Sequence, residues 1–119
     1  MRIINSFKYA LKGIFNLFKS ERNAQIHLLL AIITIAFSIY FQISNIEWIL
    51  VILSIAIVFA AEAINTAIEK TVDFISPEYH EKAGEIKDIS AAAVLLVAIA
   101  VAIVGAIIFL PKVLNLFLY

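Results

Sequence analysis

The sequence contains no cysteine and only three glycines and two prolines among its 119 residues. Without cysteine, neither a disulfide framework nor a thiolate metal site can form. The scarcity of glycine and proline argues against a fold rich in turns and loops. Charged residues are also few, at 15% of the chain, and the nine basic and nine acidic side chains cancel. The net charge therefore gives no reason to expect nucleic acid as a partner.

Apolar side chains are present in excess. They make up 64% of the residues, and the mean hydropathy is +1.04, whereas a soluble domain is about half apolar. A helix needs about 20 mostly apolar residues to span a bilayer. Spans are predicted at about 24–42, 47–75 and 87–110, with Pro111 marking the end of the last. The predicted fold is an all-α integral membrane protein with a single domain over 1–119.

Residues 1–20 differ from the predicted spans. They lack the continuous apolar run and the small-residue cleavage site of a signal peptide. Apolar residues instead recur at helical spacing, opposite lysines, which predicts an amphipathic helix on the cytoplasmic surface of the membrane. The apolar positions are Ile3, Ile4, Phe7, Leu11, Ile14, Phe15 and Phe18.

Lysine and arginine are distributed unevenly around the spans. Five precede the first span and three lie in the second connection, whereas the first connection has none and one follows the third span. Cytoplasmic loops carry the excess of basic residues. We therefore expect the N-terminus and the second connection in the cytoplasm and the C-terminus outside.

The second predicted span carries polar groups where a bilayer makes them costly. At about 100° per residue, Glu62, Asn65, Glu69 and Asp73 fall on one narrow stripe of the helix. A charge deep in the membrane costs at least about 2.5 kcal/mol, and no basic residue within the three spans is expected to pair with these acids. Two carboxylates two turns apart, with an amide between them, suit a hard cation such as Mg²⁺, which also binds substrate phosphate.

Further charged residues are expected at the depth of this acidic stripe. Glu21 precedes the first span, and Lys87 and Asp88 begin the third. A base in the membrane, metal ligands at its surface and a lysine for phosphate together describe phosphoryl transfer to a lipid alcohol. The residues alone leave this function open against an ion or proton channel, because there is no P-loop or glycine-rich nucleotide loop.

Longer motifs favour the enzyme. EAINTAIEKTVD, which starts at Glu62, and EYHEKAGEIKDISAAAVLL, which starts at Glu78, closely resemble the bacterial diacylglycerol kinase and undecaprenol kinase family. The likeness runs from RII at Arg2 through ERNAQIH at Glu21 to the third span, with Ile86 where the family has alanine. A lipid phosphatase is disfavoured, because the chain has no arginine-rich phosphate motif with a histidine nucleophile.

The resemblance implies a homotrimer in the bacterial inner membrane, with active sites at the subunit interfaces. It implies transfer of the γ-phosphoryl group of ATP, with Mg²⁺, to the hydroxyl of diacylglycerol or undecaprenol. Glu62 is implied as general base and Asn65 as its catalytic support, Glu21 and Glu69 as metal ligands, and Glu62 and Lys87 as lipid contacts. The implied ATP-binding residues are Arg2, Lys12, Glu21, Glu69, Glu78, Tyr79, His80, Lys87 and Asp88.

His27 bears on the identity of the acceptor. Members of the family with histidine at this point tend to be undecaprenol kinases, so the resemblance favours a polyprenol. The alternative is that His27 is an interfacial side chain at the start of the first span.

Overall fold

The computed structural model describes residues 1–118. Helices account for nearly all of this part of the chain, and the last three are long and apolar enough to cross a membrane. The predicted all-α membrane fold, with three spans after an N-terminal helix, is confirmed. The helices are α1 (Arg2–Ser20), α2 (Arg22–Tyr40), α3 (Asn45–Ile75) and α4 (Glu81–Leu118).

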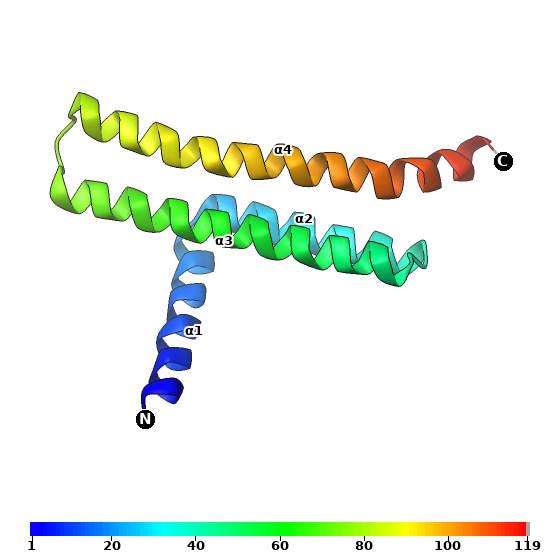
Figure 1. Ribbon diagram of the computed structural model, residues 1–119, viewed down its shortest axis with the longest axis horizontal. Helices are drawn as coiled ribbons and strands as arrows, with labels where there is room; N and C mark the ends of the chain where they lie inside the picture. The colour runs from blue at the N-terminus through cyan, green and yellow to red at the C-terminus, as the bar shows by residue number, and fades with distance from the viewer. Residues whose placement is uncertain (119) are drawn as a thin grey trace.

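The three long helices form a bundle from which α1 departs. α3 and α4 run side by side as an antiparallel hairpin, α2 lies along α3, and α1 projects away from all three (Figure 1). The change of direction occurs at Glu21, a single extended residue (φ −104°, ψ 116°) between α1 and α2. Because most apolar side chains of α1 are exposed, this helix presents a free apolar surface, as an interfacial helix requires.

The connection between α2 and α3 is fixed by local hydrogen bonds. Gln42 adopts a positive φ of 50°, and Ser44 then caps α3. The Ser44 hydroxyl accepts from the Glu47 N–H at 3.2 Å, and a Glu47 carboxylate oxygen accepts from the Ser44 N–H at 3.0 Å. This reciprocal capping box satisfies two N–H groups that a helix start leaves free.

α4 differs from its predicted bounds at both ends. It begins at Glu81, not near residue 87, and Pro111 does not end it, since the helix continues to Leu118. Proline removes an N–H from a helix, which membrane helices tolerate where other groups compensate. The carbonyl that Pro111 leaves without its helical donor is that of Ile107, and one residue further on the Lys112 ammonium donates to the Ile108 carbonyl at 3.0 Å.

The tightest apolar packing lies near this same end of the bundle. Ile43, Val51 and Ile108 form a buried cluster, against which the half-buried rings of Trp48 and Phe109 pack. This cluster joins α3 to α4 far from the loop between them. The acidic stripe lies toward the opposite end of α3, near that loop (Figure 1).

Candidate active site

The acidic stripe of α3, which runs from Glu62 to Asp73, is buried at its Glu62 end and exposed at its Asp73 end. Glu62 is 2% exposed, and with Ser38 it is one of the two largest fully buried side chains. Asn65 is also buried, Glu69 is half-buried and Asp73 is exposed. Glu62 and Asn65 therefore face the other helices of the bundle, whereas Asp73 lies at the exposed end of the stripe.

Glu62 contacts a histidine from α2. The Nε2 atom of His27 lies 3.2 Å from Oε1 of Glu62, and the His27 side chain is 22% exposed. The expectation that no basic residue in the spans pairs with the stripe is therefore wrong. Residue spacing missed this pair because His27 and Glu62 meet through the packing of α2 on α3.

Asn65 connects α4 to the second glutamate of the stripe. The Ser90 hydroxyl donates to Oδ1 of Asn65 at 2.7 Å, and Nδ2 of Asn65 donates to Oε1 of Glu69 at 3.4 Å. Since Ser90 occupies the amide oxygen, it turns the amide N–H groups toward the Glu69 carboxylate. Ser90 was not predicted as a site residue, and its place within a run of small residues gave no signal.

Lys87 pairs with the last acid of the stripe. Its ammonium contacts the Asp73 carboxylate, and both side chains are more than a third exposed. Such an exposed pair is weak, at about 0–1 kcal/mol. Lys87 therefore lies at the boundary end of the stripe with a partner that it can exchange for another anion.

The predicted nucleotide loop lies between α3 and α4. Tyr79 is 91% exposed, and Glu78 and Asp88 are also exposed. The His80 imidazole accepts from the Lys82 N–H at 3.1 Å, so it caps the start of α4. This cap leaves the rest of the loop open.

The two residues of α1 that were predicted to bind ATP are not gathered at the stripe within one chain. Glu21 is half-buried at the joint of α1 and α2, while Arg2 and Lys12 are exposed on α1, which points away from the bundle (Figure 1). Within residues 1–118, no three histidine or acidic side chains lie close enough to hold a metal by themselves.

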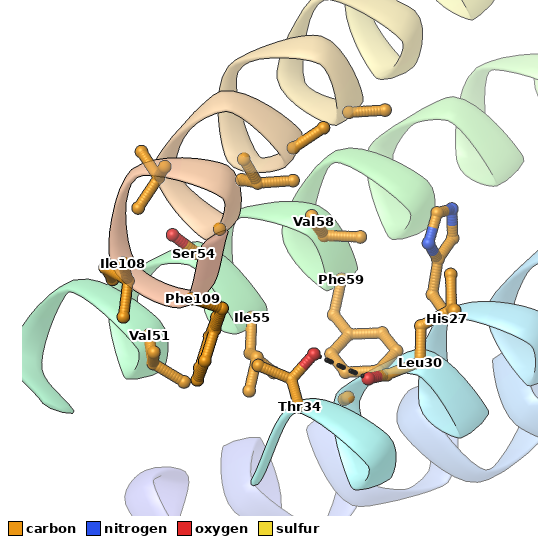
Figure 2. Close-up of a pocket in the computed structure, with 16 residues that line it drawn as sticks. His27, Leu30, Thr34, Val51, Ser54, Ile55, Val58, Phe59, Ile108 and Phe109 are labelled. Atoms are coloured by element: carbon orange, nitrogen blue, oxygen red, sulfur yellow. Dashed lines mark hydrogen bonds between the residues drawn. The ribbon is translucent and has the colours of Figure 1, made fainter. Parts of the chain in front are cut away.

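An apolar cavity adjoins the His27–Glu62 pair. It has a volume of about 340 Å³, is open to the surroundings on one side, and is lined by residues of α2, α3 and α4 that include His27. Figure 2 shows His27 at one end and Val51 and Ile108 at the other, with Phe59 and Ile55 between them. The size falls in the range of about 300–1,000 Å³ that is usual for small-molecule sites.

Comparison with known proteins identifies the family. Residues 8–109 match the family model described as prokaryotic diacylglycerol kinase. The chain is 40% identical over 111 residues to undecaprenol kinase of Bacillus subtilis, covering 93% of this chain and 90% of the relative. It is 40% identical over 108 residues to diacylglycerol kinase of Haemophilus influenzae, covering 90% and 92%.

The names of these relatives agree with the predicted lipid kinase activity and give no support to the alternative of a cation channel. The resemblance in the motifs that begin at Glu62 and Glu78 is confirmed over most of the chain. With its three apolar helices, the chain is a membrane protein and a lipid kinase, and it belongs to the prokaryotic diacylglycerol kinase family.

Proposed function

We propose that the chain transfers the γ-phosphoryl group of ATP to the hydroxyl of a membrane lipid, with Glu62 as the general base. The observation that carries this proposal is a carboxylate, 2% exposed, that contacts His27 in the wall of an apolar cavity between membrane helices. A lipid whose chain occupies the cavity brings its hydroxyl toward the His27–Glu62 end. Phosphoryl transfer needs a group that orients or deprotonates the acceptor, and Glu62 is suited to that role with Asn65 in support.

We propose Mg²⁺ as the metal, with Glu69 and Glu21 as its protein ligands. Mg²⁺ uses one or two carboxylates and fills its other positions with water and substrate phosphate. The half-buried carboxylates of Glu69 and Glu21 fit this donor set, as does the lack of a three-ligand cluster within residues 1–118. When bound, the metal neutralises charge on the ATP phosphates.

Most of the ATP-binding residues proposed here lie around the exposed end of α3. Lys87 is able to leave the exposed carboxylate of Asp73 for phosphate, with Asp88 beside it. The open loop offers further contacts in Glu78, Tyr79 and His80. Arg2 and Lys12 on α1 complete the proposed set.

The acceptor proposed first is undecaprenol, with diacylglycerol as the second candidate. Undecaprenol kinase is the name of the Bacillus subtilis relative, and His27 at the cavity end agrees with the resemblance that favoured a polyprenol. Both lipids offer a hydroxyl on a long apolar body, so competition between them in mixed micelles is the direct comparison. We expect undecaprenol to be phosphorylated in preference, and a preference for diacylglycerol would reverse the order.

The assembly and orientation are also proposals. We infer a homotrimer with composite sites, supported by the separation of Arg2 and Lys12 from the stripe within one chain (Figure 1). We place the N-terminus and the α3–α4 loop in the cytoplasm of the bacterial inner membrane and the C-terminus outside, from the distribution of basic residues.

Purified protein in detergent, supplied with labelled ATP, Mg²⁺ and each lipid in turn, tests the activity. The expected result is labelled lipid phosphate that requires both ATP and Mg²⁺. Absence of labelled lipid with either acceptor would show that the proposal is wrong.

A further inference from the structure

The burial of Glu62 creates a second requirement for the proposed reaction. When the lipid oxygen bonds to the γ-phosphorus and the bond to the bridging oxygen of ADP breaks, the hydroxyl proton is left on the Glu62 carboxylate. That carboxylate is 2% exposed, so water reaches it poorly. The enzyme must remove this proton before Glu62 can act as a base again.

His27 is placed to receive that proton. Its Nε2 atom is 3.2 Å from Oε1 of Glu62, whereas its side chain is 22% exposed and so extends from the buried carboxylate to a more accessible position. Imidazole is the side chain whose unperturbed proton exchange is centred near neutral pH. His27 is therefore both near enough to Glu62 and chemically suited to carry its proton.

Within one chain, few charged or polar groups surround the His27–Glu62 pair. In the described part of the chain, neither a lysine, an arginine nor a second carboxylate from α1, α3 or α4 is within ion-pair distance of His27 or Glu62. The nearest polar group along the stripe, Asn65, already bonds to Ser90 and Glu69, and an amide does not titrate. Within residues 1–118, His27 is thus the one basic side chain within ion-pair distance of Glu62.

We propose that His27 accepts the proton from Glu62 after each phosphoryl transfer and releases it to water at the membrane surface. The proton passes from the lipid hydroxyl to Glu62 and then to the unprotonated Nε2 of a neutral His27 whose N–H is on Nδ1. The resulting imidazolium loses one proton to solvent and returns to this tautomer, so charge and atoms balance in every cycle. His27 acts through Glu62 and is a positioning residue. This inference rests on the proposed role of Glu62 as base.

Two variants distinguish proton transfer by His27 from a role in which His27 only holds the Glu62 side chain in place. His27→Gln keeps an amide that can hydrogen-bond to Glu62 but cannot accept a proton, and we expect kcat to fall at least about tenfold with little change in KM for lipid or MgATP. The pH dependence of kcat should also differ between His27→Gln and the wild type. His27→Ala opens space beside the 340 Å³ cavity, so imidazole in the assay should restore part of the activity.

Pyrazole distinguishes basicity from filling of space, because it has the size of imidazole but is a far weaker base. We expect imidazole to restore His27→Ala activity and pyrazole to leave it low. Equal restoration by both, or a His27→Gln enzyme within about twofold of wild type at every pH, would overturn the inference. Asn23→Ala, an exposed change one turn earlier on α2, is the matched control and should behave as wild type.

The same experiments keep the two proposals apart. If Glu62→Gln retains activity, the proposed base is wrong. If Glu62→Gln is inactive while His27→Gln is as active as wild type, only the inference about His27 fails. Size-exclusion chromatography and thermal unfolding of each variant in detergent separate these outcomes from loss of folding.

Discussion

Glu62 and Glu69 lie on the same face of α3 but in different surroundings. At 1.5 Å per residue they are about two turns, or roughly 10 Å, apart along the axis. Glu62 is buried beside His27, and Glu69 is half-buried with Asn65 as its donor. A base must approach the hydroxyl to about 3 Å, so one carboxylate cannot serve both the lipid and the metal at this separation.

The separation predicts different defects in the two glutamine variants. Glu62→Gln should lower kcat about a hundredfold or more and leave MgATP affinity almost unchanged. Glu69→Gln should weaken MgATP binding itself, as measured by nucleotide titration. The exposed Glu85 on α4 provides the control, since Glu85→Gln should retain wild-type values. Equal losses of MgATP affinity in the two variants would contradict this division of roles.

The hydrogen bond from Ser90 predicts a smaller effect. Ser90→Ala frees the oxygen of the Asn65 amide, and a bond of this kind contributes about 1 kcal/mol, so kcat/KM for MgATP should fall about fivefold. Because Ser90 acts through Asn65, the double variant with Asn65→Ala should be no worse than Asn65→Ala alone.

Another buried serine tests whether the Ser90 effect is specific. Ser38 bonds only to the Thr34 carbonyl of its own helix, at 2.7 Å, so Ser38→Ala should leave kcat/KM unchanged. A Ser90→Ala enzyme with the kinetics of wild type would show that the bond does not orient Asn65.

At the scale of elements, the α3–α4 hairpin is closed at the end opposite its loop by an ion pair. The Lys112 ammonium donates to Oε2 of Glu47 at 2.6 Å, and both side chains are about three-quarters buried. Glu47 is also part of the capping box at the start of α3. The pair thus links the first turn of α3 to the segment of α4 just after Pro111.

Removing this lysine should affect stability rather than catalysis. Lys112→Met keeps an apolar stem but leaves Glu47 without its partner, so we expect the midpoint of thermal unfolding to fall. Thermal unfolding in detergent measures this change, and kcat well below the unfolding midpoint should stay at the wild-type value. Lys8→Met, on the exposed surface of α1, should not shift the midpoint.

A compensating change tests the ion pair directly. If the loss arises from an unpaired carboxylate, Glu47→Gln should restore part of the stability of Lys112→Met. No shift in the midpoint of Lys112→Met would mean that the pair contributes nothing to closure of the hairpin.

At the scale of the whole molecule, one chain leaves its proposed site incomplete. Apolar side chains cover most of its exposed surface, and few residues are buried. α1, with Arg2 and Lys12, extends away from the bundle (Figure 1). A second copy is therefore the expected source of the remaining groups.

Subunit mixing tests the composite site. If Glu21 and Glu62 of one site come from different chains, trimers assembled from Glu21→Gln and Glu62→Gln protomers contain some intact sites. We expect each variant to be inactive alone and the mixture to recover measurable activity. Mixtures that remain inactive would indicate that each site is made by a single chain.

The absence of cysteine makes the proposed orientation easy to measure. Asn5→Cys on α1 and Phe117→Cys near the end of α4 both introduce an exposed thiol. On intact spheroplasts, an impermeant maleimide should label Phe117→Cys and should label Asn5→Cys only after lysis. The reverse pattern would invert the topology.

The sequence by itself determined the elements and the family. Length and apolar content predict spans, and helical periodicity places Glu62, Asn65 and Glu69 on one stripe, because both depend on residues close together in the chain. The confirmed resemblance also rests on contiguous motifs. Local signals misplaced the ends of α4, since a proline does not by itself end a membrane helix and α4 continues through Pro111 to Leu118.

The tertiary structure alone decided what faces the stripe. α2 and α4 are apolar on nearly every side, so their patterns do not indicate which face packs inward. The rotation of each helix against α3 brings His27 to Glu62 and Ser90 to Asn65. The single extended residue Glu21 sends α1 away from the bundle. These contacts join residues far apart in the chain, and only packing determines them.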